Sequence, residues 1–341
     1  MNPRHRRYLI PGLLVALLVV AAVASLTREA EGAEAGRLVR VAEPGVVSTV
    51  DDARVAEASG MALDGDDPDL AYVVNDSGND AVVFAVRVST GEVVGAHPVQ
   101  GTSWVDTEAM AREGDRLWIA DVGDNRATRD DLALYAITAP GPGESPVEAT
   151  RYPVRLADGP ADVESVAVRA DGSIVLVTKE LAGRILRIAD PRPDRENVAE
   201  DTGGRTLGFA TDAAALPGDG LLVRGYASAV VLAAGDLAAP REVATLELPA
   251  AEQGETVAIE PGASTALVGS EGVPHDLERI AVPSAELASP TAEGEGTEED
   301  PAVPQGSEQA DGVGRPWLSI LGGVVGVVIL ATFAAWAVRR E

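Results

Sequence analysis

Short runs of apolar and β-branched residues, separated by turns rich in Gly, Asp and Pro, recur along the middle of the chain. The runs LAYVVND and LALYAIT, which begin at Leu70 and Leu132, have the length and composition typical of β-strands. Similar runs follow at regular intervals up to about residue 284. The pattern predicts an all-β domain.

One short motif recurs five times in this region: an acidic residue, two further positions, Ala or Gly, and then usually an apolar residue. The copies are spaced by 51, 56, 48 and 43 residues and begin at Glu57, Glu108, Glu164, Asp212 and Glu255. Each copy is followed by a Gly- and Asp-rich turn and two further strand-like runs, and several have a fourth. A four-stranded antiparallel unit of about 40–50 residues that repeats around an axis is typical of a β-propeller blade.

The two ends of the repeat complement each other. The fifth unit has no fourth strand, whereas the run RLVRVAEPGVV at residues 37–47 is a strand with no unit of its own. We expect this N-terminal strand to complete the last blade and close the ring. The sequence therefore predicts a five-bladed β-propeller over residues 37–284; separate β-sandwiches are the alternative, but nothing resembling a linker interrupts the repeat.

Both ends of the chain differ from this domain. Residues 1–26 combine a basic start, an apolar run and a small-residue cleavage site, which indicates a secretion signal; an uncleaved anchor is the alternative. Residues 285–316 are acidic and rich in Pro and Gly, as expected of a disordered stalk. The uncharged run 317–338, followed by the basic tail 339–341, predicts a transmembrane helix with the propeller outside the cytoplasm and the tail inside.

The net charge of the chain indicates which kinds of ligand or partner it can bind. The formal net charge is −27, and there is no cysteine. Such an acidic chain is unsuited to nucleic acid, which binds through Lys and Arg, and it favours metal ions or cationic partners. Disulfide and thiol chemistry are excluded. We therefore expect a single-pass protein of the cell membrane that binds an extracytoplasmic ligand or protein.

The repeat also predicts where a ligand would bind. In a propeller the innermost strand of each blade lines the channel, and its start lies beside the loops between second and third strands. The five repeated acids should therefore surround one channel mouth, together with polar residues of those loops. The residues expected at this mouth are Glu57, Asp76, Glu108, Asp121, Asp124, Asn125, Arg126, Glu164, Lys179, Glu180, Asp212, Arg224, Tyr226, Glu255 and Glu271.

Two interpretations of this mouth remain open. Clustered carboxylates are the ligands that Ca²⁺ prefers, and Asp121 and Asp124 in the loop DVGDN are the candidate metal ligands. In the other interpretation Arg126, Arg129, Lys179 and Arg224 pair with neighbouring carboxylates and join the blades without any ligand. Apart from Ca²⁺, no cofactor is expected.

The stretches EASGMAL…YVVNDSG and DTEAMA…LWIADVGDN resemble secreted bacterial propellers of the esterase-like, phytase-like and SdiA-regulated kinds. The resemblance covers the propeller only. It implies the fold, and it is compatible with calcium binding or phosphoesterase activity, but no catalytic motif of these proteins is matched.

Signals of enzymatic activity are few. The chain has three histidines, and His97 and His275 lack the paired spacing of a zinc site. No G-x-S-x-G elbow, P-loop or dinucleotide motif is present. We therefore expect a binding module with an acidic channel mouth, with a metal-assisted phosphoester or ester hydrolase as the alternative function.

Overall fold

The computed structural model describes residues 37–39 and 45–283. The expected signal or anchor (1–26), stalk (285–316), membrane helix (317–338) and tail (339–341) lie outside the described residues. Within the described part, no helix has the length and apolar character needed to cross a membrane.

The described chain is built almost entirely of β-strands, with two short 3₁₀ helices, η1 (Ala53–Val55) and η2 (Pro217–Asp219). Most strands form five antiparallel groups of four. In chain order the groups are β3 (Ala58–Leu63), β4 (Leu70–Asn75), β5 (Val82–Arg87) and β6 (Val93–Gln100); β7 (Thr107–Glu113), β8 (Arg116–Asp121), β9 (Ala133–Thr138) and β12 (Thr150–Leu156); β13 (Val163–Val168), β14 (Ile174–Thr178), β15 (Gly183–Ile188) and β16 (Asn197–Thr206); β17 (Asp212–Ala215), β18 (Leu221–Arg224), β19 (Ser228–Leu232) and β20 (Glu242–Glu247); β21 (Gly254–Ile259), β22 (Thr265–Ser270), β23 (His275–Ala281) and β2 (Gly45–Val50).

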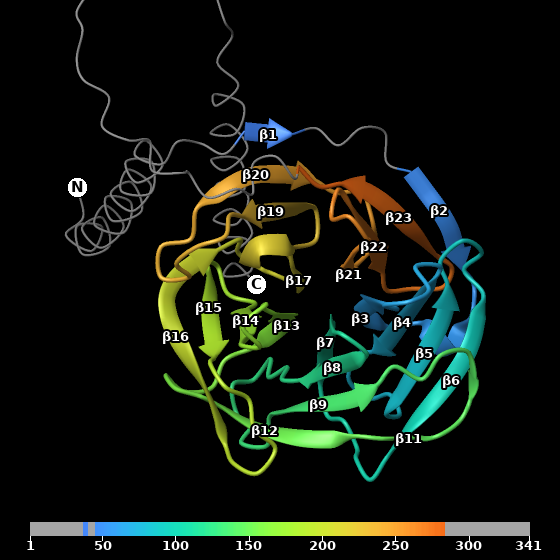
Figure 1. The fold of residues 1–341 in the computed structure, drawn as a ribbon, viewed down its shortest axis with the longest axis horizontal. Helices are drawn as coiled ribbons and strands as arrows, with labels where there is room; N and C mark the ends of the chain where they lie inside the picture. Colours follow the sequence, from blue (N-terminus) through green and yellow to red (C-terminus); the bar gives the residue numbers. More distant parts are fainter. Residues whose placement is uncertain (1–36, 40–44, 284–341) are drawn as a thin grey trace, which may run out of the picture. The chain divides into compact units, whose positions relative to one another are not determined.

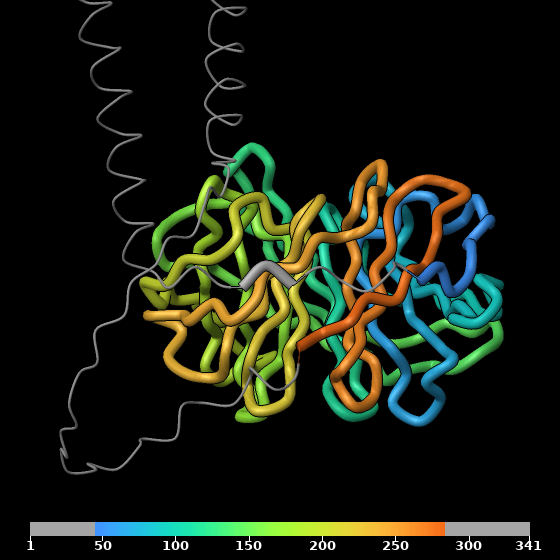
Figure 2. Tube along the Cα trace, turned by 90° about the horizontal axis from the view of Figure 1, so that it is seen from above, coloured from blue at the N-terminus to red at the C-terminus, as the bar shows by residue number. Residues whose placement is uncertain are grey.

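The groups stand side by side in a ring. The first strand of each group contacts the first strand of the next, and β21 of the last group contacts β3 of the first. These strands lie nearest the centre in Figure 1, and the fourth strands lie at the rim. Seen from the edge, the described part is a flattened disc with loops on both faces (Figure 2). The arrangement is a β-propeller, so the predicted all-β propeller fold is confirmed.

The N-terminal segment closes the ring, but with other residues than expected. β2 pairs antiparallel with β23, with Val50 opposite His275 and Gly45 opposite Arg279. The earlier strand β1 (Arg37–Val39) pairs instead with β20 in the fourth group, in parallel. The single strand predicted over residues 37–47 is therefore wrong. Pro44 separates the two ranges in the sequence, and a proline has no N–H to donate to a strand ladder.

The hydrophobic core lies between neighbouring groups. One buried cluster joins the second and third groups, and it includes Trp118 and Tyr152 of the second group, whose rings are T-shaped with centroids 4.7 Å apart. Every residue of β3 and β4 is buried, because each face of the sheet is covered by one of its two neighbouring sheets. Gly60 permits a close approach of the first two groups, since a Cβ at this position would lie 2.5 Å from the backbone of Ala109 in β7.

The first two groups are also tied together at the rim. The short strands β10 (Gly143–Glu144) and β11 (Val147–Glu148), from the connection between β9 and β12, pair in parallel with β6. His97 of β6 is fully buried there, with Nε2 2.9 Å from the carbonyl oxygen of Gly141 and Nδ1 3.0 Å from that of Ser145. His97 therefore connects β6 to the segment between β9 and β12.

The closure predicts that β2 contributes much more to stability than β1. Deleting residues 45–50 exposes the edge of β23 and removes Val50, which is 1% exposed, from the core. We expect a loss of roughly 3–5 kcal/mol in the free energy of unfolding, or about 10 °C in melting temperature. The matched control deletes residues 37–39 and should melt within a few degrees of the parent. Equal melting temperatures for the two deletions, measured by circular dichroism, would contradict the closure.

Candidate functional site

Four of the five innermost strands contain a register shift near their first residue. At such a bulge one residue leaves the strand ladder and its side chain is turned to a new direction. The residues at the four shifts are Ser59, Glu108, Glu164 and Glu255. The fourth group has no shift, and Asp212 pairs directly with Arg224. Three of the five repeated acids therefore occupy equivalent bulges at the same end of the channel.

The bulges show that the repeat was misaligned in the first group. Ser59, and not Glu57, is the counterpart of Glu108, because both lie at the shift. Glu57 precedes its bulge by two residues, as Asp106 and Asp162 precede theirs. Sequence analysis missed these two aspartates, although the signal is present as D-T-E and D-V-E in the second and third units.

Three carboxylates come together at this channel mouth. Asp76 follows β4, Asp106 precedes β7 and Glu108 lies at the bulge; one oxygen from each lies within 4.8 Å of the others. Burial, together with the charge of Glu57, raises the pKa of Asp76. Burial and then Asp76 raise the pKa of Asp106. Burial, followed by the neighbouring carboxylates, raises the pKa of Glu108 to about 11. We call these three residues the carboxylate triad.

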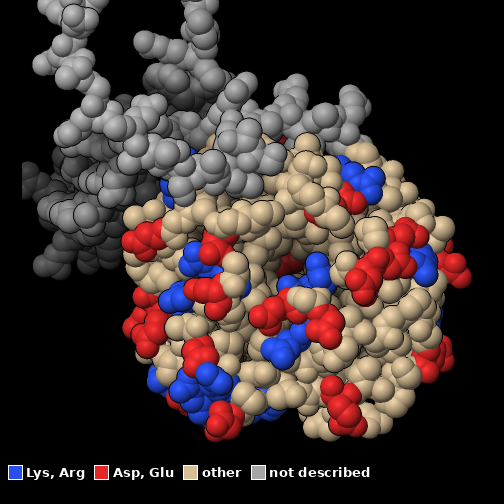
Figure 3. All heavy atoms as spheres, in the orientation of Figure 1, with Lys and Arg blue, Asp and Glu red and all other residues tan. Residues whose placement is uncertain are grey.

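Most basic side chains of the described chain are paired with carboxylates, but none of them is paired with the triad. On the face drawn in Figure 3, acidic and basic side chains gather around a central hollow and in patches near the rim. Many form ion pairs, such as Arg279 with Glu260 at 2.6 Å. Among the described residues, no Lys or Arg nitrogen lies within 4.0 Å of a triad carboxylate. The negative charge of the triad is therefore not neutralised by an ion pair.

One ammonium group lies near the triad and is already paired. Lys179 Nζ is 2.9 Å from Glu164 Oε2 and 5.4 Å from the centroid of the Tyr226 ring. Burial raises the pKa of Glu164 to about 8, and Lys179 offsets part of this rise. Burial alone would lower the pKa of Lys179, but Glu164 raises it overall, so the ammonium form is favoured. Within the third group, this ion pair connects the residue that follows β14 with the bulge in β13.

Two further carboxylates extend the acidic surface from the fifth group. Glu255 is 3% exposed, and its Oε2 atom has no hydrogen-bond partner among the described residues. Burial raises the pKa of Glu255, whereas Lys179 lowers it. Burial, and then Glu255, Asp76 and Glu57, raise the pKa of Glu271 to about 7. Glu255 and Glu271 therefore add negative charge close enough to the triad to interact with Asp76.

The loop that carries Asp121 and Asp124, the predicted metal ligands, is held by its own hydrogen bonds. Asp121 Oδ1 is 2.9 Å from Arg129 and also accepts from the backbone N–H of Asp106. The oxygens of Asp124 accept from the backbone N–H groups of Thr128 and Arg129, each at 2.8 Å. These bonds engage both buried carboxylates. The structure thus supports the charge-network interpretation for this loop, and the convergent carboxylates are those of the triad.

The remaining residues expected at the mouth fall into two sets. Asn125 and Arg126 are exposed at the tip of the same loop, and Glu180 pairs with Arg184 at 2.8 Å. Tyr226 is 41% exposed and contacts Lys179. These residues border the mouth without joining the triad.

Asp212 and Arg224 are wholly buried and bind backbone. Asp212 accepts from the N–H groups of Ala213 and Val257, and burial raises its pKa well above the usual range. Arg224 donates to the carbonyl oxygens of Thr256 and Gly269, and burial lowers its pKa to about 10. Both side chains therefore connect the fourth group to the fifth by hydrogen bonds to its backbone.

No protein-family profile matches the chain, and no curated protein matches it in sequence. Among solved structures, a glutaminyl cyclase of Myxococcus xanthus is similar with a TM-score of 0.47 and 14% identity, over 73% of this chain and 100% of that one. A PQQ-bound aldose sugar dehydrogenase of Streptomyces coelicolor gives 0.42 and 11%, over 70% and 95%. A gluconolactonase of Xanthomonas campestris gives 0.40 and 13%, over 67% and 73%. Such distant likenesses carry no argument about the activity of this chain, and the resemblance to esterase-like, phytase-like and SdiA-regulated propellers stays a prediction.

The raised pKa values predict how stability depends on pH. A carboxyl group whose pKa is raised by folding retains a proton in the folded state that the unfolded chain has released. The free energy of unfolding of metal-depleted protein should therefore fall as pH rises from the ordinary Glu value of 4.5 through about 7 for Glu271 and about 8 for Glu164. Burial lowers the pKa of His275, so this one group makes the free energy of unfolding rise with pH, against the larger number of carboxyl groups. We expect a higher melting temperature at about pH 5 than at about pH 8, and a shallower slope for Glu271→Gln. A melting temperature that rises over this interval would contradict the assignment.

The pair of Lys179 and Glu164 predicts energetic coupling. Lys179→Met leaves a buried carboxylate without its partner and should lower the free energy of unfolding by about 2–4 kcal/mol. Glu164→Gln in the same chain removes that carboxylate, so the double variant should lose less than the sum of the two single losses. Urea unfolding of the four proteins measures the coupling. Strictly additive losses would show that the two side chains do not stabilise each other.

Proposed function

We propose that this chain is a five-bladed propeller in which each four-stranded group is one blade, and that its acidic channel mouth binds a divalent cation as part of a ligand site. The observation that carries the proposal is the carboxylate triad. Asp76, Asp106 and Glu108 bring oxygens within 4.8 Å of one another, and no ion pair with a described residue neutralises them. A bound cation would offset both the burial and the mutual repulsion that raise the pKa values of these three groups.

The chemistry of the donors favours a hard cation. All three side chains offer carboxylate oxygens, the donors that Ca²⁺ and Mg²⁺ prefer, and the triad holds neither His nor Cys, which zinc prefers. Ca²⁺ takes about six to eight oxygens, so water or ligand oxygens would complete its shell. We therefore propose Ca²⁺, now with the triad as its protein ligands in place of Asp121 and Asp124.

The surroundings of the triad fit a ligand that carries both polar and anionic groups. Lys179 is paired with Glu164 but is 20% exposed, and the hydroxyl of the half-exposed Tyr226 lies in the same part of the mouth. A cation held by the triad would add positive charge beside this ammonium group. This combination is also what a metal-assisted phosphoester hydrolase requires, so hydrolysis is the second candidate function.

The location that we propose rests on the sequence of the two ends. The basic and apolar start at residues 1–26 and the apolar run 317–338 with its basic flank support a protein anchored in the cell membrane, with the propeller outside the cytoplasm. Extracytoplasmic fluids are the compartments in which millimolar calcium is ordinarily available, which suits weak calcium sites.

Titration of the metal-depleted protein with Ca²⁺, Mg²⁺ and Mn²⁺ in a calorimeter tests the cation site. We expect saturable binding of Ca²⁺ and a stabilisation of about 2.7 kcal/mol at a hundredfold excess over Kd. Asp106→Asn and Glu108→Gln should each weaken binding by at least about tenfold, because each removes one charged ligand. Asp80→Asn is the matched control, since it removes an exposed charge from the loop that carries Asp76. Unchanged melting after chelation and repletion would refute the cation site.

The same preparations separate binding from hydrolysis. Turnover of phosphoesters or simple esters that needs the cation and is lost in Glu108→Gln would favour the hydrolase. Cation binding without turnover leaves the binding module as the function.

A further inference from the structure

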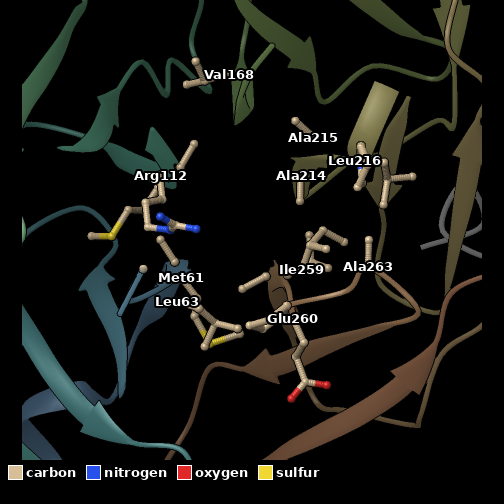
Figure 4. Close-up of a pocket in the computed structure, with 18 of the residues that line it drawn as sticks. Met61, Leu63, Arg112, Val168, Ala214, Ala215, Leu216, Ile259, Glu260 and Ala263 are labelled. Carbon is tan, nitrogen blue, oxygen red and sulfur yellow. The ribbon is translucent and has the colours of Figure 1, made fainter. Parts of the chain in front are cut away.

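A second pocket lies at the other end of the channel, away from the triad. The innermost strands begin at the acidic mouth, and the pocket is formed where they end, with Leu63 of β3, Val168 of β13 and Ile259 of β21 among its walls. Its volume is about 420 Å³, within the range of about 300–1,000 Å³ that small-molecule sites occupy. Figure 4 shows these side chains around a common space. We call it the apolar end pocket.

Most of the side chains that line this pocket are apolar, although they are partly open to solvent and lie beside polar backbone groups. Ala111, Val168, Ala214, Ala215 and Ile259 are each only half-buried, and they come from four different innermost strands. Strand ends next to loops are ordinarily polar, and a cluster of half-exposed apolar side chains loses free energy to water unless it is covered. The apolar walls therefore favour a ligand with an apolar body.

One cationic side chain enters the pocket without a carboxylate partner. Figure 4 shows Arg112 extending from β7 into the space between the walls. Its Nη1 donates to the carbonyl oxygen of Gly114 at 2.7 Å, and no described carboxylate lies within 4.0 Å of its guanidinium. A guanidinium group has five N–H donors, so most of its capacity is left for an anion.

The two acids that border the pocket are engaged elsewhere. Asp64 accepts from the hydroxyl of Tyr72 and from two backbone N–H groups of its own turn. Glu260 forms a two-bonded ion pair with Arg279, at 2.6 and 2.7 Å, and Figure 4 shows its carboxylate turned away from the pocket. Burial raises the pKa of Asp64, but its hydrogen bonds and the nearby charge of Arg112 lower it overall. The charged group that extends into the pocket is nevertheless the guanidinium of Arg112, in a chain whose net charge is −27.

We propose that the apolar end pocket binds a small amphipathic carboxylate, with its apolar body against the side chains of Ala214, Leu63 and Ile259 and its carboxylate on Arg112. The planar guanidinium group matches a carboxylate through two parallel N–H···O bonds. This site is separate from the triad, because it lies at the opposite ends of the innermost strands and needs no metal. The pocket gives the propeller a second ligand class, opposite in charge to the cation of the acidic mouth.

Calorimetric titration of the metal-depleted full chain with octanoate and with 1-octanol tests the proposal. Octanoate should bind saturably, and the uncharged 1-octanol at least about tenfold more weakly, because it lacks the bonds to Arg112. Arg112→Gln should reduce octanoate binding to the level of 1-octanol and leave 1-octanol unchanged. Ala214→Phe, which fills the pocket, should abolish both.

Arg116→Gln is the matched control. Arg116 lies in the same hairpin but pairs with Glu113 and stacks on Trp118, so octanoate binding should not change. Arg112 is exposed, and its variant should melt like the parent, which separates loss of binding from loss of folding. No saturable binding of octanoate, or equal octanoate binding by the parent and Arg112→Gln, would overturn the proposal.

Discussion

The mutual covering of neighbouring sheets is the constraint on which the rest of this structure depends. A four-stranded group has two apolar faces, and only the next group in the ring can cover each of them. All residues of β3 and β4 are buried for this reason, and Gly60 lets β3 approach the backbone of β7. The ring can be stable only when its last gap is closed, which β2 does by pairing with β23.

The same packing decides where charge can gather. Within the inner strands nearly every side chain is buried, so polar groups of these strands are concentrated at the strand ends and at the bulges, where the ladder is interrupted. Glu108, Glu164 and Glu255 lie at such bulges and remain almost fully buried. Burying three carboxylates close together is unfavourable unless a positive charge approaches them. Lys179 provides one for Glu164, and a divalent cation would provide it for the triad.

The two ends of the channel have opposite chemistry. The starts of the innermost strands present carboxylates, whereas their ends present Ala, Leu and Ile around Arg112. One strand therefore carries side chains for both environments, because β7 has Glu108 near its start and Arg112, four residues later, near its end. A ring of such strands separates two potential ligand sites by the length of the channel, which permits one to be altered without the other.

The sequence by itself determined the repeat, the strand-rich fold, the acidic charge and most of the residues near the mouth. Buried strands and the turns that bound them depend on the local amino-acid composition, which the sequence shows directly. Tertiary structure decided which acids converge. The motif aligned Glu57 with Glu108, but the bulges show that Ser59, two residues later, is the counterpart, since a short motif does not reveal where a bulge lies. Asp106 belongs to the triad although it lies outside the motif, whereas Asp121 and Asp124 are engaged by bonds to Arg129 and to their own loop. These outcomes depend on contacts between residues far apart in the chain, and spacing along one strand does not encode them.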